Sequence, residues 1–256
     1  MTYRNIKIAV DQKTAVVVIN RPKKLNALNR ETIAELGSAI DELSHNSSIR
    51  VIVITGEGDK AFVAGADIAE FAHFSSEEGQ ELAQRGQEEL FDKIEMCPKI
   101  VIAAINGYAL GGGLELAMAS HIRIASENAL MGLPEVSLGV IPGYGGTQRL
   151  PKLIGKGRAM ELISAASMID AKKACDWGLV NSVVPQDELM DTAIKLATKI
   201  SKNSASAISN AIDAINAYDQ DGGFQREIEN FGHCFGTDDF KEGTDAFLNK
   251  RKPNFD

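Results

Sequence analysis

Two continuous apolar runs constrain the fold of this chain more than any other feature. Val51–Thr55 and Ile100–Ile105 place apolar side chains on both faces of an extended backbone. A strand of this kind is stable when both faces are covered, as in the parallel sheet of an α/β protein. Shorter runs at Ile122–Ala125 and Val180–Val184 predict two further strands. The sequence therefore predicts an α/β fold built around a buried sheet.

Local signals predict the elements around this sheet. Ile6–Val10 and Ala15–Asn20 are rich in β-branched residues and flank a short polar segment, which predicts a hairpin. Helical spacing of apolar residues begins at Glu31, and Asn29 is the expected N-cap. The segment Ser75–Glu78 has the pattern of a capping box and predicts the start of the next helix.

The last part of the chain has a different pattern. After Pro185 the apolar residues recur almost wholly at helical spacing, so we expect an α/β core over residues 1–185 and an α-helical region over residues 186–256. The end of this region is rich in phenylalanine. Two interpretations remain open: these side chains pack on a partner subunit, or they cover the core of their own chain.

Composition excludes several classes of function. The 27 basic and 35 acidic residues give a net charge of −8 without any basic block, which argues against nucleic acid or an anionic membrane as the main partner. No apolar run reaches the length of a membrane span, and the N-terminal residues have no signal character. Three widely spaced cysteines favour free thiols in a reducing compartment. We therefore expect a cytoplasmic protein.

A run of three glycines, Gly111–Gly113, lies between the strand Ile100–Ile105 and an apolar helix. It does not fit a dinucleotide or phosphate loop, because Leu116 occupies the place of the last required glycine and no Gly-Lys-Ser/Thr follows. The glycines either permit a tight turn or expose backbone N–H groups at a helix N-terminus. Ala61–Ile68 offers the same small residues after the strand Val51–Thr55. Two N–H groups from two such loops would form an oxyanion hole.

Two glutamates lie in unusually apolar, glycine-rich surroundings. Glu115 follows the triple glycine, and Glu135 follows Met-Gly-Leu-Pro. Burial raises the pKa of a carboxyl group, and two such groups over one substrate would handle a proton and a water molecule. This arrangement suits the addition of water across a polarised double bond. Alternatively, each glutamate stabilises a helix N-terminus, with Pro134 at the first helical position before Glu135.

These segments together resemble the crotonase superfamily, and the enoyl-CoA hydratases most closely. The matching stretches span nearly the whole chain and are residues 21–28, 61–68, 105–117, 134–135, 139–150, 178–180 and 247–255. The resemblance implies a spiral of ββα units and a C-terminal helical region that builds homotrimers, often paired into homohexamers. It also implies an acyl-CoA thioester as substrate.

The resemblance assigns roles residue by residue. The N–H groups of Ala66 and Gly112 would bind the thioester oxygen. Glu115 would hold and activate water for attack at C3, and Glu135 would exchange the proton at C2. The further residues expected to contact substrate are Lys24, Leu25, Ala27, Ala64, Asp67, Ile68, Leu110, Leu133, Pro134 and Gly143.

Some of these positions have a second interpretation. Either Lys23 or Lys24 would lie near the CoA phosphates. Alternatively, these residues are solvated lysines of a loop. Leu133 stands where some hydratases carry glutamine, which affects the positioning of water or the acyl preference. Gly143 is expected close to the catalytic water. Tyr144 either lines the acyl pocket or fills a turn.

The resemblance therefore implies an enoyl-CoA hydratase that acts on trans-2-enoyl-CoA and needs no cofactor, since coenzyme A is part of the substrate. The alternatives are an enoyl-CoA isomerase or another crotonase-type reaction, and a non-catalytic acyl-CoA-binding protein. No metal site is expected, because His45, His73, His121 and His233 do not cluster with one another or with cysteine.

Overall fold

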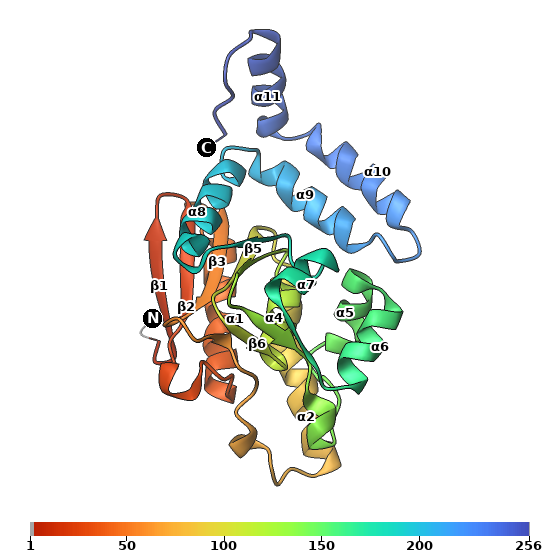
Figure 1. Cartoon of the computed structure of the whole chain (residues 1–256). Coiled ribbons are helices and arrows are strands. Elements are labelled where there is room, and N and C mark those ends of the chain that lie inside the picture. The colour runs from red at the N-terminus through yellow and green to blue at the C-terminus, as the bar shows by residue number, and fades with distance from the viewer. Residues whose placement is uncertain (1–2, 256) are drawn as a thin grey trace.

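The computed structural model describes residues 3–255, and within them two β-sheets are surrounded by helices (Figure 1). The larger sheet has the strand order β1-β2-β3-β5-β7-β10. Its strands, in that order, are Ile6–Asp11, Thr14–Ile19, Val51–Gly56, Ile100–Ile105, Ile122–Ser126 and Ser182–Val184. The smaller sheet has the order β4-β6-β8-β9. Its strands are Ala61–Val63, Tyr108–Leu110, Leu130–Gly132 and Met168–Asp170.

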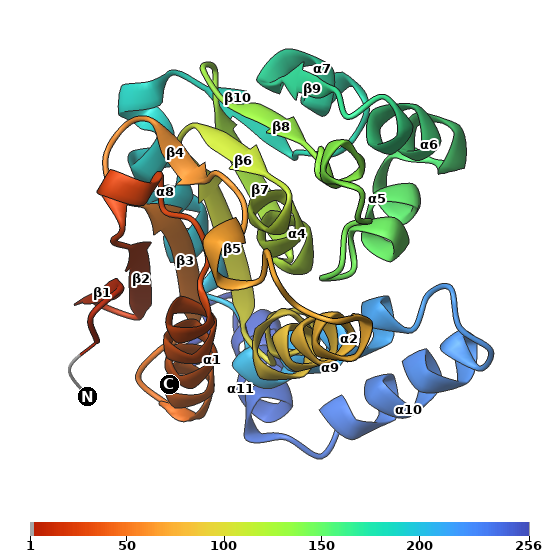
Figure 2. The same cartoon turned by 90° about the horizontal axis from the view of Figure 1, so that it is seen from below.

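The chain repeats one pattern three times. It passes from a strand of the larger sheet to a strand of the smaller sheet and then into a helix, as β3–β4–α2, β5–β6–α4 and β7–β8–α5. The three helices are Ser76–Gly86, Gly112–Ala119 and Gly146–Ile154. Successive repeats pair in parallel within each sheet, and Figure 2 shows β4, β6 and β8 lying beside β3, β5 and β7. The predicted spiral of ββα units is confirmed.

Two short strands lie where the sequence analysis expects none. β4 lies within the segment Ala61–Ile68, and β6 lies between β5 and the triple glycine. Each strand has only three residues. Alternation of side chains over three residues does not produce a recognisable period, so the sequence pattern could not reveal these strands.

The apolar runs are buried because both faces of the larger sheet are covered. Ile52 and Ile54 of β3 belong to the main core, which includes α1 (Arg30–His45) and α4. Val51 and Val53 point to the other face and pack against α8 (Leu189–Ile200). Every residue of β3 is consequently buried, as expected for a strand of a covered parallel sheet.

The predicted helix starts are also confirmed. The Asn29 side chain accepts a hydrogen bond of 2.9 Å from the Thr32 N–H at the start of α1. Ser75 and Glu78 form both bonds of a capping box at the start of α2. This helix continues through a π-helical turn, Gln87–Phe91, into α3 (Asp92–Glu95). The remaining helices before α8 are α6 (Lys156–Ser164) and α7 (Ala171–Asp176).

The C-terminal helices α9 (Ala205–Asn216), α10 (Gly223–Cys234) and α11 (Asp238–Leu248) extend beyond the sheets (Figure 1). Their large apolar side chains do not cover the core of this chain, since Phe224 is 86% and Phe247 83% exposed. The same is true of Ile228, Phe231 and Phe235. The interpretation in which these phenylalanines pack on their own core is therefore wrong. Among residues 3–255, no helix is long and apolar enough to cross a membrane.

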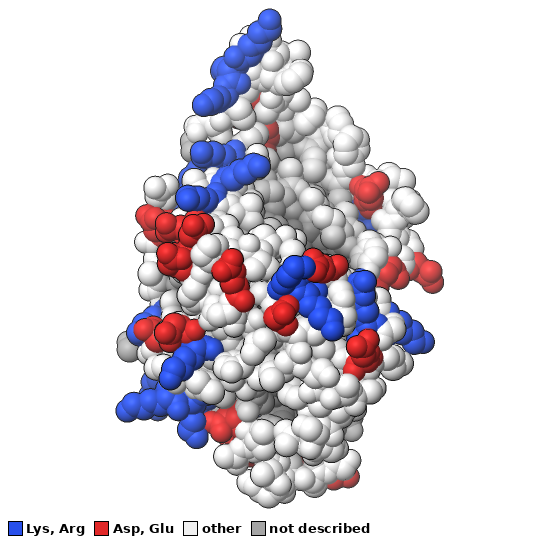
Figure 3. All heavy atoms as spheres, viewed as in Figure 1, with Lys and Arg blue, Asp and Glu red and all other residues white. Residues whose placement is uncertain are grey.

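The visible surface carries charges of both signs. Figure 3 shows basic side chains grouped toward the upper end of the face that it presents, and small groups of acidic and basic side chains below them, with uncharged surface between the groups. The net charge of −8 therefore does not make this face uniformly acidic.

Gly113 offers a test of how closely the repeats are packed. A Cβ atom at this position would lie 2.0 Å from the carbonyl oxygen of Val63 in β4. We expect Gly113→Ala to lower the free energy of unfolding by about 2–3 kcal/mol, because β4 and α4 must separate. The control is Gly157→Ala in α6, where a Cβ meets nothing within 4 Å. Urea denaturation should show that this second variant is at least as stable as the parent protein.

Candidate active site

The triple glycine brings the start of α4 against the smaller sheet. Gly111 has φ +51°, and its N–H donates a 2.9 Å hydrogen bond to the Gly132 carbonyl in β8. Gly112 is the first residue of α4. The first N–H groups of a helix have no acceptor within the helix, so the Gly112 N–H is available to a ligand. The turn thus leaves the Gly112 N–H without an acceptor inside the helix, and its role as an oxyanion donor stays a prediction.

The loop after β4 supplies a second donor. Leu28 forms a parallel bridge with Ala66: the Leu28 N–H donates to the Gly65 carbonyl at 2.9 Å, and the Asp67 N–H donates to the Leu28 carbonyl at 2.7 Å. In a bridge of this type the N–H of the middle residue, here Ala66, points away from the partner strand. Ala66 and Gly112 both line the same pocket, so two backbone donors from separate repeats meet there.

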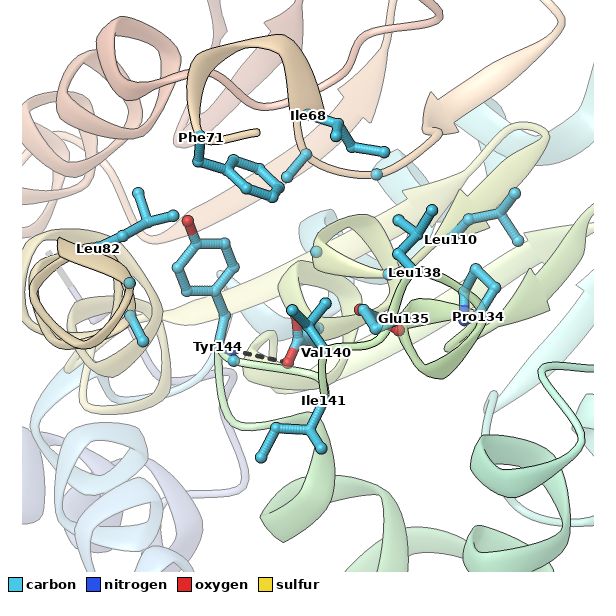
Figure 4. A pocket seen from close by; sticks show the side chains of 18 of the residues that line it. Ile68, Phe71, Leu82, Leu110, Pro134, Glu135, Leu138, Val140, Ile141 and Tyr144 are labelled. Carbon is cyan, nitrogen blue, oxygen red and sulfur yellow. Dashed lines mark hydrogen bonds between the residues drawn. The ribbon is translucent and has the colours of Figure 1, made fainter. Parts of the chain in front are cut away.

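This pocket has a volume of about 260 Å³ and mostly apolar walls (Figure 4). Its predicted lining residues are Ala64, Ala66, Ile68, Leu110, Gly112, Glu115, Pro134, Glu135 and Gly143. Other lining side chains, which the sequence did not indicate, are Phe71, Leu82, Ala83, Leu138, Val140 and Ile141. Tyr144 lies in the turn of residues 143–145 and also lines the pocket, so it fits both interpretations of that residue.

Two backbone hydrogen bonds fix the side chain of Glu115 at the wall of the pocket. Its side chain is only 1% exposed, and its Oε1 accepts hydrogen bonds of 2.8 Å from the N–H groups of Tyr144 and Gly146. Because both donors bind the same oxygen, Oε2 is left for a ligand. Burial raises the pKa of Glu115 to about 7, and the negative charge of Glu135 adds to the effect. The two carboxyl groups are therefore close enough to interact.

Glu135 begins a short 3₁₀ turn, Glu135–Leu138, directly after Pro134. Its Oε1 lies 2.9 Å from the position of a Cβ on Gly111, so the carboxyl group reaches the glycine turn. Its Oε2 is buried and has no hydrogen-bond partner among the described residues. Burial raises the pKa of Glu135, and its own backbone N–H partly opposes the shift. A carboxyl group at a pocket wall with one buried, unpartnered oxygen is suited to exchange a proton with a ligand.

Arg149 supports this arrangement, although the sequence analysis gave it no role. Its Nη1 donates to the Tyr144 carbonyl at 2.9 Å, and its Nη2 contacts Glu95 at 2.6 Å and Asp92 at 3.1 Å. The side chain thereby anchors the loop whose N–H groups bind Glu115. The sequence signal that could have revealed this role is an arginine in a segment rich in glycine and leucine. Such an arginine is expected to be buried, and a buried arginine needs acidic partners.

Several predicted contact residues lie outside the pocket lining. Asp67 forms an ion pair of 3.0 Å with Arg21, whose guanidinium also donates to the Ala27 carbonyl. The Leu25 carbonyl accepts a 3.0 Å hydrogen bond from the Ala64 N–H. These contacts brace the loop that carries Ala66. Lys24 is exposed at the end of the 3₁₀ turn Pro22–Lys24.

Leu133 is fully buried, and its Cδ1 lies 3.0 Å from the position of a Cβ on Gly146. It therefore packs behind the loop that binds Glu115. Among the described residues, no group of three or more His, Cys, Asp and Glu side chains is placed to hold a metal ion.

Known proteins match both the sequence and the fold. The sequence model of the Enoyl-CoA hydratase/isomerase family matches residues 10–256. The chain belongs to this family, in agreement with the resemblance predicted from its motifs.

Similarity to individual members extends over the whole chain. The crotonyl-CoA hydratase of Syntrophomonas wolfei is 46% identical over 258 residues, which cover 100% of this chain and 99% of that protein. The short-chain-enoyl-CoA hydratase of Clostridium acetobutylicum is 47% identical and covers 98% of this chain and 97% of its own. The crystal structure of an enoyl-CoA hydratase from Bacillus anthracis has a TM-score of 0.93 at 39% identity, and the match covers 98% of this chain and 99% of that one.

The pKa of Glu115 predicts how stability depends on pH. The unfolded chain loses this proton near pH 4.5, whereas the folded protein holds it to about pH 7. The contribution of Glu115 to stability therefore falls as the pH rises from about 4.5 to about 7, by up to about 3 kcal/mol, and is constant above that range. Glu115→Gln keeps an oxygen acceptor but has no such proton. Its stability relative to the parent protein should increase over this pH range.

Urea denaturation at pH 5, 6, 7 and 8, at one protein concentration, measures this difference. Glu127→Gln is the control, because Glu127 is exposed at a turn and the same charge is removed there. A difference between Glu115→Gln and the parent protein that stays constant from pH 5 to pH 8 would contradict the assignment of a raised pKa to Glu115.

Proposed function

We propose that this protein is an enoyl-CoA hydratase, which adds water reversibly to trans-2-enoyl-CoA and forms 3-hydroxyacyl-CoA. One observation carries the proposal: the carboxyl groups of the buried Glu115 and the half-buried Glu135 line one apolar cavity together with the backbone donors Ala66 and Gly112. The family match and the names of the similar proteins support this reaction over others.

The backbone donors supply the electrophilic half of the reaction. The thioester oxygen accepts hydrogen bonds from the Ala66 and Gly112 N–H groups, which draw electron density from the C2–C3 double bond. Negative charge on this oxygen increases as water attacks C3. A preorganised donor of this kind is typically worth about 3 kcal/mol in the transition state, and the N-terminus of α4 adds a favourable dipole.

The carboxyl groups supply the water and the proton. Glu115, fixed through Oε1, holds the water molecule with Oε2 and directs its oxygen to C3. Glu135 delivers a proton to C2, and the proton released by the water returns to the carboxyl pair, so one water molecule is added and the enzyme is restored. Because the two acids interact, their protons belong to the pair rather than to either residue. The reaction requires no metal ion and no cofactor beyond the CoA of the substrate.

Isomerisation of the double bond is the second candidate activity. It moves a proton from C2 to C4 and needs no water, and Glu135 has a buried oxygen without a partner that suits removal of the C2 proton and its return at C4. Glu115→Gln therefore separates the two reactions: isomerisation of 3-enoyl-CoA should survive this substitution better than hydration does. Binding of acyl-CoA without turnover would instead identify a non-catalytic member of the family.

The helical region 186–256 has an assembly role in this proposal. α8 packs on the larger sheet, whereas α9–α11 expose apolar side chains that a homotrimer, or a homohexamer made of two trimers, would bury. We also infer a reducing, cytoplasmic location, because Cys97, Cys175 and Cys234 form no disulfide.

The direct test is the hydration of crotonyl-CoA, followed as the loss of enoyl absorbance. Glu115→Gln and Glu135→Gln should each lower kcat by about 10²–10⁴-fold, the usual contribution of a general acid or base. KM should change by less than about threefold, since neither acid is needed to bind the CoA portion. Glu127→Gln removes an exposed carboxylate and should leave both constants unchanged. Absence of turnover by the parent protein on short and medium chains would exclude the proposal.

A further inference from the structure

The two ends of the cavity are lined by different residues. Ile68, Leu110 and Pro134 lie toward one end in Figure 4, and Tyr144 and Leu82 lie at the other. Ile68 lies two residues after the donor Ala66, Leu110 lies two residues before the donor Gly112, and Pro134 directly precedes Glu135. A substrate whose thioester lies at those donors therefore enters from this end.

The acyl chain continues from C3 past Glu115. Oε1 of Glu115 accepts its 2.8 Å hydrogen bond from the Tyr144 N–H, so Tyr144 is the next residue along this path. The ring of Tyr144 also lies against the start of α4, where a Cβ on Gly112 would be 3.4 Å from Cδ2. The carbons beyond C3 consequently run toward the Tyr144 ring.

On the sides away from the cavity, neighbouring groups pack closely against the Tyr144 ring. It stacks on Phe91 with 4.8 Å between the ring centroids and an angle of 14° between their planes. Behind it, Gly86 at the end of α2 leaves no room for a side chain, since a Cβ there would be 2.2 Å from Cε1. The Tyr144 N–H is bound to Glu115 and its carbonyl to Arg149. The ring therefore has no space into which it can withdraw when a longer chain enters.

We propose that Tyr144 is the end wall of the acyl cavity and restricts this protein to short-chain acyl thioesters. The proposal rests on the proposed function for the orientation of the substrate. The cavity volume of about 260 Å³ lies below the roughly 300–1,000 Å³ of ordinary ligand pockets, which agrees with a short acyl group. Burial raises the pKa of the Tyr144 phenol, so the wall is uncharged at neutral pH. The specificity comes from the ring rather than from its hydroxyl group.

The test compares two saturated thioesters, butyryl-CoA and octanoyl-CoA, which bind without being hydrated. Isothermal titration calorimetry should show that the parent protein binds butyryl-CoA at least about tenfold more tightly. Tyr144→Ala opens the cavity toward Phe91 and Gly86. Each methylene that enters the opened space is worth about fourfold in affinity, so the octanoyl-to-butyryl affinity ratio should rise at least about tenfold.

Three further variants isolate the cause. Tyr144→Phe keeps the ring, and its affinity ratio should stay within about twofold of the parent value. Tyr144→Leu keeps an apolar filler, which protects folding, and should raise the ratio to an intermediate value. Met160→Ala removes an apolar side chain that is 59% exposed and lies outside the cavity lining, and it should leave the ratio unchanged.

Equal affinity of the parent protein for both thioesters would overturn the proposal. So would an unchanged ratio in Tyr144→Ala and Tyr144→Leu variants that still bind butyryl-CoA. Hydration of trans-2-butenoyl-CoA and trans-2-octenoyl-CoA is measured in the same proteins. If no variant hydrates either compound but the affinity ratios change as described, the hydratase proposal fails while the role of Tyr144 as a wall stands.

Discussion

The hydrogen bonds from the Tyr144 and Gly146 N–H groups to Glu115 are the interaction on which the site depends. A buried carboxylate is unstable unless its charge is compensated, and here the main compensation comes from the backbone of one loop. The loop keeps its shape because Arg149 lies beneath it. A Cβ on Gly145 would be 2.1 Å from Nη1 of this arginine, so the loop backbone lies directly on the guanidinium group.

One residue therefore links the chemistry to the shape of the cavity. The backbone of Tyr144 orients Glu115, while its ring closes the cavity against Phe91. A change that moves this loop alters both the position of the water and the space for the acyl chain. The π-helical turn between α2 and α3 supports the same loop. It carries Phe91, and the residues Asp92 and Glu95 that follow it pair with Arg149.

The sequence predicted those parts of the structure that depend on local patterns. β3 and β5 were predictable because covered strands require apolar residues on both faces, and the helix starts at Asn29 and Ser75 because caps need particular side chains. Glu115 and Glu135 stood out because charged residues are rare among glycine, leucine and proline. In contrast, β4 and β6 are too short to show a period. The role of Arg149 depends on acids far away in the chain, and no local pattern connects Glu95 to residue 149.

The C-terminal helices also contact the helices that carry Arg149 and its acidic partners. Asn216 at the end of α9 donates a 2.7 Å hydrogen bond to the Glu95 carbonyl, which also accepts a 3.1 Å bond from Nε2 of His121. Asp219, just beyond α9, forms a 2.8 Å ion pair with Lys152 of α5. Thus α9 is tied both to α3, which holds the acidic partners of Arg149, and to α5, which carries Arg149 itself. α9–α11 also expose apolar surface, so in the proposed assembly a partner that packs there would stabilise the same contacts that hold Glu115 in position. The proposed assembly and the geometry of the active site would then be coupled through α9, although no described side chain of the helical region lines the cavity.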